Sequence, residues 1–264
     1  MRYCRFAHPS FIKPSYGVIE SDSVSPLVST GDFFGEWDSL RTEPTSFSLN
    51  EVRLLAPVQP SKIVCVGRNY LEHAAELGNK LPDEPLLFLK APTSLIGPDD
   101  VIRLPSQSQQ VEHEGELGFV IGRRCSRLGE TEDPLAYVLG YTCVNDVTAR
   151  DLQRKDVQFT RAKSFDTFCP VGPFIETAIN PLDVLVTARL NGQVKQSART
   201  SAMAFSVPFL VRYISHAMTL LPGDIIATGT PAGVSRMKPG DVVEIEVESI
   251  GILRNTVESQ ESGV

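Results

Sequence analysis

The chain has 264 residues, of which 22% are charged and 42% apolar, and its formal net charge is −7. These values are ordinary for a globular protein, and the acidic balance argues against a nucleic-acid partner because no basic stripe is available to meet phosphates. No apolar run has the length of a membrane span, and the first residues lack the apolar stretch of a signal peptide. With five cysteines in no Cys-x-x-Cys spacing, we expect a cytoplasmic protein.

The first part of the chain, residues 1–57, is predicted to form a small β subdomain. It is rich in serine, proline and glycine, with short strand-like segments at residues 2–6 and 16–19. The segment Ala-Pro-Val-Gln-Pro that starts at residue 56 resembles a linker. A second and larger domain is therefore expected over residues 58–264.

The larger domain is predicted to be mostly β with few helices. Continuous apolar runs at residues 63–66 and 86–89 are typical of strands that are buried on both faces. Asn191 and Gly192 separate two further strand-like segments, and this pair favours the positive φ angles of a type I′ hairpin turn. Helices are expected at only three places, which are residues 70–77, 148–155 and 208–218.

Two of these helices have recognisable starts. Thr148 and Asp151 form the Ser/Thr-x-x-Asp/Glu pattern of a helix N-cap. Ser206 is a good cap for the last helix, with a proline in the first turn where its missing N–H costs no hydrogen bond. A β-rich run at residues 136–144 ends shortly before the helix start at Thr148. Asp146 is therefore expected at a junction between a strand and a helix.

The segment that starts at residue 112 reads Glu-His-Glu-Gly-Glu-Leu-Gly-Phe-Val-Ile and places Glu114 and Glu116 two residues apart. In an extended strand, such residues point to the same face. Two unit charges about 4 Å apart repel by roughly 4 kcal/mol at an effective dielectric of about 20, so a cation is expected between them. With Asp146 as a third carboxylate, the all-oxygen set favours Mg2+, with Mn2+ or Ca2+ as alternatives. The simpler interpretations are an edge strand whose glutamates face water and an aspartate that only favours a helix start.

His73 is the best candidate for an acid or a base. It precedes Glu76 by three residues, which places both side chains on one face of a helix. A carboxylate beside an imidazole orients the ring and raises its basicity. A solvated pair on a surface helix is the alternative. Motifs for a non-haem iron triad, a zinc protease, a serine hydrolase or a nucleotide-binding loop do not occur in the sequence.

Two further polar residues are candidates for contacts with an anion. Lys163 could bind an anionic or carbonyl oxygen, although a lone lysine is most often surface charge. Thr230 lies in a glycine-rich turn after a strand, where hydroxyl and backbone N–H groups can hold a carboxylate. An ordinary turn is the alternative there. Residues 68–84 are poor in apolar anchors and are predicted to form a lid that orders when substrate binds.

Five segments follow one another in an order that is typical of one family. They begin with Val64-Cys-Val-Gly-Arg-Asn-Tyr, His113-Glu-Gly-Glu-Leu-Gly, Asp146-Val-Thr-Ala-Arg-Asp, Lys163-Ser-Phe-Asp and Gly223-Asp-Ile-Ile. Together they resemble the signatures of the fumarylacetoacetate hydrolase family. The resemblance implies a mixed β-sandwich roll and a homodimer. It is greatest to the single-domain branch of acylpyruvate hydrolases and 2-hydroxyhepta-2,4-diene-1,7-dioate isomerases, because the short N-terminal segment is unlike the large one of the eukaryotic hydrolases.

The resemblance also implies roles for individual residues. Those that match the family's ligands of Mg2+ or Mn2+ are Glu114, Glu116 and Asp146. Those that match substrate-contacting positions are Lys163, Gln153 and Thr230, and Arg68 lies beside the lid where an anion can be met. His73 and Glu76 match a pair on the lid that assists the attack of water.

These roles predict an enzyme, dependent on Mg2+ or Mn2+, that acts on acylpyruvate-type 2-oxo acids in the catabolism of aromatic compounds. The metal would stabilise an enolate, and the C–C bond would be hydrolysed through it. The same enolate would permit isomerisation of a 2-hydroxyhepta-2,4-diene-1,7-dioate or decarboxylation of oxaloacetate, so both remain alternatives. A further alternative is a non-catalytic protein that uses the metal to bind dicarboxylates, for which His73 and Glu76 would be unnecessary.

Overall fold

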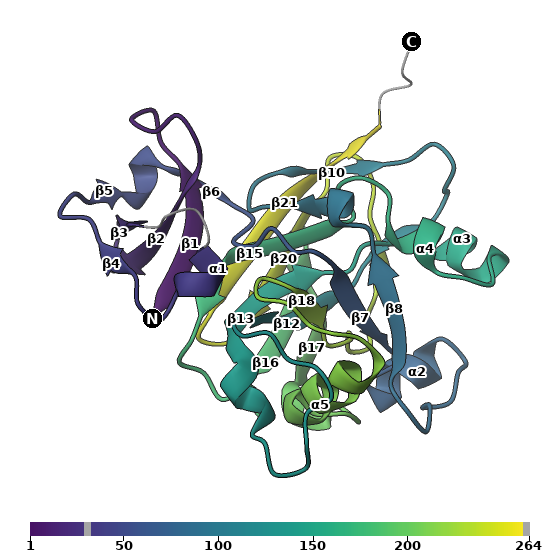
Figure 1. Cartoon of the computed structure of the whole chain (residues 1–264). Helices are drawn as coiled ribbons and strands as arrows, with labels where there is room; N and C mark the ends of the chain where they lie inside the picture. Colours follow the sequence, from purple (N-terminus) through teal and green to yellow (C-terminus); the bar gives the residue numbers. More distant parts are fainter. Residues whose placement is uncertain (29–32, 261–264) are drawn as a thin grey trace.

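The structure is a computed structural model that describes residues 1–28 and 33–260 (Figure 1). Sheets dominate this part of the chain, and the helices are short and lie at its periphery, so the predicted mostly β fold is confirmed. None of the described helices combines the length and apolar character needed to cross a lipid bilayer. The α-helices are α1 (Phe33–Glu36), α2 (Leu71–Glu76), α3 (Arg150–Lys155), α4 (Thr160–Lys163) and α5 (Val207–Ala217), with 3-10 turns at Leu49–Glu51, Pro92–Ser94, Pro134–Tyr137 and Thr200–Ala202.

The largest sheet joins the N-terminal strands to the rest of the chain. Its main path is β4-β3-β2-β1-β15-β13-β12-β18-β7-β8, with β5 paired to β3, β6 to β1 and β9 to β15. Figure 1 shows β1 to β6 as a lobe at the left, linked to the centre where β1 pairs with β15. The division at residue 57 stays a prediction. The strands are β1 (Arg2–Ala7), β2 (Ser15–Glu20), β3 (Ser23–Val28), β4 (Arg41–Thr42), β5 (Phe47–Ser48), β6 (Arg53–Leu55), β7 (Ile63–Gly67), β8 (Leu86–Lys90), β9 (Leu95–Ile96), β12 (Gly115–Ile121), β13 (Val138–Asn145), β15 (Cys169–Glu176) and β18 (Ile225–Ala227).

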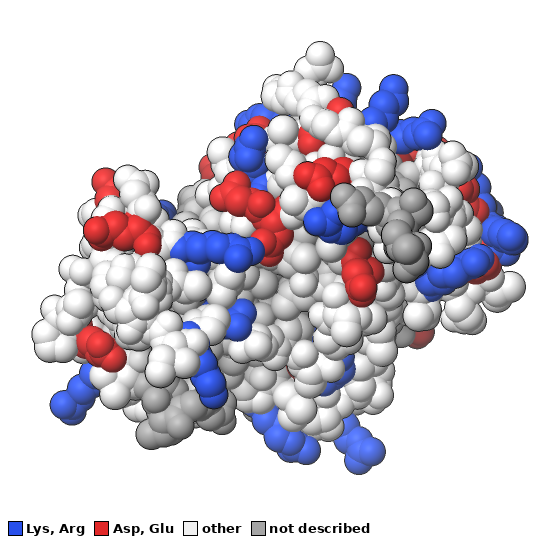
Figure 2. Space-filling model, turned by 90° about the horizontal axis from the view of Figure 1, so that it is seen from above, with Lys and Arg blue, Asp and Glu red and all other residues white. Residues whose placement is uncertain are grey.

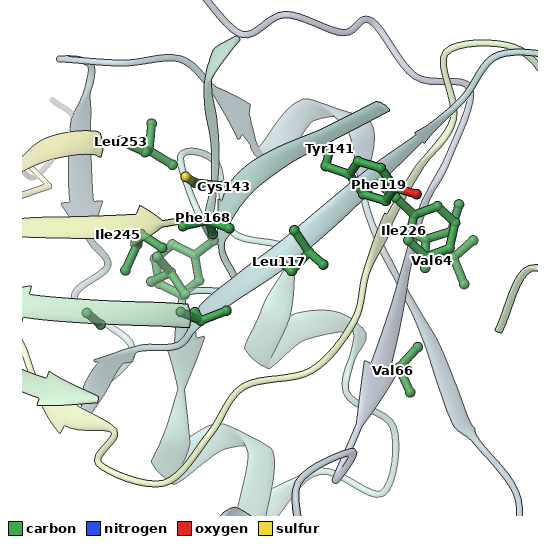
Figure 3. Close-up of a cluster of buried hydrophobic side chains, with 14 of the residues drawn as sticks. Val64, Val66, Leu117, Phe119, Tyr141, Cys143, Phe168, Ile226, Ile245 and Leu253 are labelled. Atoms are coloured by element: carbon green, nitrogen blue, oxygen red, sulfur yellow. The ribbon is translucent and has the colours of Figure 1, made fainter. Parts of the chain in front are cut away.

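A second sheet packs against the centre of the first and encloses the main core. Its order is β10-β21-β20-β16-β17, and a small third sheet has the order β14-β11-β19. In Figure 3, Ile245 of β20 and Leu253 of β21 lie beside Cys143 of β13 and Phe168. The strands are β10 (Val101–Leu104), β11 (Val111–His113), β14 (Thr148–Ala149), β16 (Leu185–Leu190), β17 (Gln193–Arg199), β19 (Ser235–Arg236), β20 (Val242–Val247) and β21 (Gly251–Ser259).

The central strands of the large sheet are buried on both faces. Along β12, Leu117 and Phe119 point into the main core, whereas Val120 points into a second apolar cluster on the other face. The strand β7 alternates in the same way, so the prediction for residues 63–66 is confirmed. The prediction for residues 86–89 is wrong, because β8 is the edge of the sheet, residues 86–88 are only partly buried and Leu89 is exposed.

The hairpin and two of the predicted helices occur as expected. Asn191 and Gly192 have φ angles of 53° and 75°, and they connect β16 to β17 in the predicted turn. The helices expected at residues 70–77 and 208–218 are α2 and α5. Ser206 is the N-cap of α5, although its side chain makes no capping hydrogen bond.

The predicted helix start at Thr148 is wrong. Thr148 belongs to β14, and its hydroxyl donates to the carbonyl oxygen of Asp146 at 2.8 Å instead of capping a helix. The carboxylate of Asp151 accepts the hydroxyl of Ser108 at 2.6 Å, so it is also engaged elsewhere. The helix α3 begins only at Arg150, and the one-turn helices α1 and α4 were not expected from the sequence.

Candidate active site

A cavity of about 290 Å³ lies between α2, α3, α4 and the edge strand β8. Every predicted site residue except Glu76 lines it, and Glu76 contacts one that does. Leu86 and Phe88 of β8 supply apolar wall, which explains why this edge strand has an apolar sequence without being buried on both faces. The polar lining consists of Arg68, His73, Asn79, Glu114, Glu116, Asp146, Arg150, Gln153, Arg154, Lys163 and Thr230.

Three buried carboxylates converge at the inner end of this cavity. Glu114 directly precedes β12, Glu116 lies within it, and Asp146 directly follows β13. The two strands are paired, with Gly115 opposite Asn145, so their ends bring the three residues together. Each contributes one oxygen to a set whose atoms all lie within 4.8 Å of one another.

The backbone around the three carboxylates is fixed by hydrogen bonds. The N–H of Asp146 donates to the carbonyl of Glu114 at 2.9 Å, and the side-chain oxygen of Asn145 accepts the N–H of Glu114 at 3.0 Å. The carboxylate of Glu116 accepts the N–H of Gly229 at 2.7 Å. An all-oxygen set that is buried and held in this way fits a hard divalent cation such as Mg2+, Mn2+ or Ca2+.

Three buried cations surround these carboxylates. The Nζ atom of Lys163 lies 2.6 Å from Glu114 and 2.6 Å from Asp146, and Lys90 donates to the other oxygen of Asp146 at 2.6 Å. Arg150 donates to Glu114 and, at 2.8 Å, to Glu112. The inner end of the cavity is therefore a network of paired charges. Each described carboxylate that lines the cavity is within hydrogen-bond distance of a cation or a backbone N–H.

The network shifts the pKa values of its members in opposite directions. Burial would raise the pKa of Glu114, but Lys163 and Arg150 outweigh burial and hold it below the usual value. Burial, together with the charges of Asp146 and Glu114, raises the pKa of Glu116 well above the usual value. Burial would lower the pKa of Lys163, but Asp146 and Glu114 raise it. Glu116 is thus the carboxylate with the least compensation from the protein, and a bound cation would supply what it lacks.

The pair on α2 is docked against the body of the protein. His73 is buried, and its Nδ1 atom lies 3.1 Å from one carboxylate oxygen of Glu76. The other oxygen of Glu76 accepts the backbone N–H of Gly233 at 3.0 Å. Glu76 therefore holds the imidazole and also ties α2 to the loop that carries Thr230; the predicted lid over residues 68–84 stays a prediction. With Nδ1 directed at Glu76, Nε2 is the ring nitrogen left for a proton transfer.

Two of the predicted substrate contacts are already engaged with the protein. The hydroxyl of Thr230 donates to the carbonyl of Gly115 at 2.9 Å and accepts the amide N–H of Gln196 at 2.7 Å. The side-chain oxygen of Gln153 accepts from Arg150 at 2.6 Å, which leaves its NH2 group for another partner. Both residues still line the cavity, and their roles toward a substrate stay predictions.

Sequence reasoning did not identify Lys90, Arg150 or Glu112 as members of the site. Lys90 ends an apolar strand, and only the fold places it against Asp146, 56 residues away. Arg150 and Glu112 lie inside segments that the sequence analysis singled out. Their charges, a few residues from the predicted metal ligands, were the signal that could have assigned them to the site. The structure assigns all three to the network of charges around the carboxylates.

Comparisons with known proteins show the same family that the motifs resemble. Residues 62–258 match the family described as fumarylacetoacetate (FAA) hydrolase C-terminal, and residues 1–57 match the one described as Rv2993c-like, N-terminal. Because the first match spans most of the chain, the protein belongs to the fumarylacetoacetate hydrolase family.

Several relatives have named activities. The structure of 5-carboxymethyl-2-hydroxymuconate delta-isomerase from Mycobacterium smegmatis has a TM-score of 0.89 and 44% identity, and the match covers 98% of this chain and 100% of that one. The structure of maleylpyruvate hydrolase from Sphingobium sp. SYK-6, in complex with manganese(II) and pyruvate, has a TM-score of 0.81 and 29% identity, with 99% and 100% covered. Oxaloacetate tautomerase YisK of Bacillus subtilis (strain 168) is 42% identical over 226 residues, which cover 80% of this chain and 75% of the relative.

Proposed function

We propose that this protein is a divalent-metal-dependent enzyme that hydrolyses a C–C bond in acylpyruvate-type 2-oxo acids. The observation that carries the proposal is that three convergent carboxylates and a buried histidine, which is paired with a carboxylate, line or border one cavity. A cluster of carboxylates alone would suit a site that only binds. The manganese and pyruvate complex of maleylpyruvate hydrolase supports the choice of metal and of a 2-oxo acid.

Glu114, Glu116 and Asp146 would hold Mg2+ or Mn2+, with Ca2+ as an alternative. When bound, the cation would act as a Lewis acid toward the oxygens of a 2-oxo acid. Lys163 places a further positive charge beside the same oxygens, and the NH2 group of Gln153 is free to orient the substrate. Because the hydroxyl of Thr230 is engaged with Gly115 and Gln196, Thr230 contributes through its backbone N–H.

His73 acts as the general base in this proposal. Its Nδ1–H donates to Glu76, so Nε2 accepts a proton from a water molecule as that water attacks the distal carbonyl of the acylpyruvate. Glu76 stabilises the imidazolium that forms. The C–C bond then breaks, its electron pair leaves with the enolate of a 2-oxo acid, and the imidazolium returns its proton to that enolate. Burial of His73 keeps other water molecules away from the base.

Isomerisation and decarboxylation are the alternatives within the same family. The relatives named as an isomerase and a tautomerase support a proton shift as the alternative to C–C cleavage. The same cavity would serve either the proton shift or the cleavage. In a proton shift, His73 would move a proton between carbon or oxygen atoms of the substrate and would need no attacking water. Decarboxylation of an oxaloacetate-type acid would need the cation and Lys163 but not His73.

A panel of substrates distinguishes these activities. We expect acylpyruvates to be cleaved in the presence of Mg2+ or Mn2+, measured as the loss of enol absorbance together with release of the two acids. Oxaloacetate and a 2-hydroxydienedioate, measured in parallel, report tautomerisation, decarboxylation and isomerisation. Metal-dependent binding of these acids without turnover of any of them would indicate the non-catalytic alternative. The homodimer, the cytoplasmic location and the role in aromatic catabolism stay predictions.

A further inference from the structure

The edge strand β17 of the second sheet has one fully buried side chain, and that side chain is an amide. Gln196 is 1% exposed, whereas its neighbours Lys195 and Ser197 are exposed. Charged side chains can project from the surface into water, as many Lys and Arg side chains do in Figure 2. A buried amide has no such partner, and it costs free energy unless protein groups bind it. The groups that bind Gln196 therefore indicate what the amide contributes.

The partners of Gln196 use both ends of the amide. Its oxygen accepts the N–H of Gly115 at 2.9 Å and lies 3.2 Å from Nδ1 of His113. Its NH2 group donates to the hydroxyl of Thr230 at 2.7 Å and to the carbonyl of Pro231 at 2.6 Å. A backbone N–H only donates and a backbone carbonyl only accepts, so these partners permit one orientation of the amide. All of its hydrogen-bonding capacity is used inside the protein.

A β-bulge directs Gln196 toward these partners. The register between β16 and β17 shifts beside it and leaves Lys195 as an extra residue in β17. Bulges change the direction of a side chain and are frequent beside active sites. At the bulge, β17 closely approaches the loop at residues 229–233, which we call the glycine loop. A Cβ atom on Gly233 would lie 1.9 Å from the carbonyl oxygen of Lys195. The strand is therefore shaped to hold the glycine loop.

The glycine loop contacts two functional groups of the site. The N–H of Gly229 donates to Glu116, a candidate metal ligand, at 2.7 Å. The N–H of Gly233 donates at 3.0 Å to Glu76, which also binds the proposed base. Gln196 binds the part of the loop that lies between these two N–H groups. Its amide therefore sets the position from which the loop contacts both carboxylates.

The same amide is tied to the strand that carries the candidate metal ligands. Gly115, which donates to Gln196, lies between Glu114 and Glu116 in the chain. One side chain thus connects this strand to the loop whose N–H groups contact Glu116 and Glu76. Catalytic groups must be held close to their productive geometry, because a displacement of about 1 Å can lower turnover by a factor of about 10². The amide joins the two segments whose separation decides that geometry.

We infer that Gln196 is a positioning residue of the active site, which holds the glycine loop and β12 at a fixed separation. This inference rests on the proposed function and adds a member to its site. Gln196 does not line the cavity, so it acts through Glu116 and Glu76 and not on the substrate. Without the amide, Glu116 would be less restrained and would bind a cation more weakly. The orientation of His73 would also be less fixed, which would slow turnover.

The test replaces the amide with an apolar side chain of similar length. In metal-free Gln196→Met, the N–H groups of Gly229 and Gly233 should exchange their hydrogens faster than in the wild type. With Mg2+ and an acylpyruvate, kcat should fall about 10–100-fold and KM should change by less than about threefold, because misplaced groups cost the transition state more than they cost binding. The affinity for Mg2+, measured by calorimetry, should fall about threefold or more, as for the loss of other outer-shell partners.

A second variant keeps the test decisive if Gln196→Met does not fold. Gln196→Asn retains the amide on a stem that is one carbon shorter, so its two ends cannot reach the glycine loop and Gly115 together. It should show the same changes in kcat, affinity for Mg2+ and hydrogen exchange, but smaller ones. All assays are made at a temperature at which circular dichroism shows each protein to be folded, so that a lower kcat does not reflect unfolded molecules.

The matched control is Asn255→Leu. Asn255 on β21 of the same sheet is also 1% exposed, and its NH2 group donates to the carbonyls of Gly97 at 2.9 Å and Asp100 at 2.8 Å, outside the cavity. This variant should lower the melting temperature as Gln196→Met does, yet keep the kcat, the KM and the affinity for Mg2+ of the wild type.

The outcomes separate this inference from the proposed function. Wild-type kcat and affinity for Mg2+ in the variants of Gln196, or equal losses in Asn255→Leu, would overturn the inference and leave the proposed function intact. If the wild type turns over no 2-oxo acid in the presence of Mg2+, the proposed function fails. The affinity for Mg2+ and the hydrogen exchange of the glycine loop then decide the role of Gln196.

Discussion

The two ends of the cavity differ in how their charges are treated. At the inner end, Glu114, Asp146 and Lys163 are buried and locked in ion pairs of 2.6 Å. At the outer end, Arg68 has no ion-pair partner among the described residues, and Arg154 is exposed. Buried charges are expensive to desolvate and are tolerated only when they are paired, whereas exposed ones can wait for a ligand.

The difference indicates that the two ends of the cavity suit different functions, which are stabilisation of charge in the transition state and selection among substrates. A site that stabilises charge in a transition state needs dipoles and charges fixed in advance, because reorganising them during the reaction would cost free energy. A site that chooses among substrates needs groups whose partner is the substrate itself, because the difference in affinity comes from leaving them unpaired. The inner end has the first character and the outer end has the second.

The largest expected effect comes from breaking the inner end. Glu116→Ala should abolish turnover and the stabilisation by Mg2+, because one of three ligands is lost. For the wild type, Mg2+ at a hundredfold excess over its dissociation constant should stabilise the fold by about 2.7 kcal/mol. Thermal unfolding with and without Mg2+ measures this difference.

Glu116→Gln is the companion variant for this test. Its amide oxygen can still accept the N–H of Gly229, but the charge is gone, so it should also lose the response to Mg2+. Removing this charge should leave the metal-free fold about as stable as before, because burial, Asp146 and Glu114 already raise the pKa of Glu116. Full activity in the presence of EDTA would show that the three carboxylates are not a metal site.

A smaller effect is expected from His73 on α2, the proposed base. His73→Ala should lower acylpyruvate cleavage by a factor of about 10²–10⁴, which is the usual contribution of a positioned acid or base. The affinity for Mg2+, measured by calorimetry, should not change, because His73 is not one of the convergent ligands. Glu72→Ala is the control on the same helix, because Glu72 is exposed and should tolerate the change. Normal cleavage by His73→Ala would reduce the pair with Glu76 to a structural contact.

The inner and outer ends also differ in how well the sequence predicts them. Glu114 and Glu116 were recognisable because a spacing of two in a strand is a local feature, and Asp146 because it ends a β-rich run. Lys90 has no such local signal, and it joins the site only because β8 lies at the edge of the sheet, where it approaches Asp146. Spacing can reveal a ligand set, but it cannot reveal a counter-charge contributed by a distant strand.

The errors in the predicted elements have a related cause. Thr148 has the local pattern of a helix cap, yet its hydroxyl bonds to Asp146 and its backbone pairs with Glu112 of β11. The apolar run at residues 86–89 predicts a buried strand, yet one side of that strand faces the cavity. In both cases a tertiary contact beside the site outweighs the local preference.

The smallest expected effect concerns a carboxylate–cation pair outside the cavity, which shows whether a lowered pKa alone marks a functional group. Glu176 on β15 accepts the N–H of Ala178 at 3.0 Å and the Nε–H of Arg2 at 2.9 Å. Burial would raise the pKa of Glu176, but these hydrogen bonds outweigh burial and lower the pKa below its usual value of 4.5. The contact lies where β1 joins the large sheet, so we expect it to serve folding rather than catalysis.

Glu176→Gln should therefore reduce the free energy of unfolding at pH 7 by about 1 kcal/mol and leave turnover unchanged. Because folding lowers the pKa of Glu176, its contribution is fully present above pH 4.5 and is lost as the pH falls through the lower pKa of the folded state. Urea unfolding of wild type and variant between pH 7 and pH 3 should give curves that converge toward the acid end. Glu20→Gln, at an exposed position on the neighbouring strand β2, is the control and should follow the wild type throughout. A constant difference in the free energy of unfolding between Glu176→Gln and the wild type at every pH would mean that the contact stabilises the fold through packing. A loss of turnover would mean that the contact between β1 and β15 affects the active site.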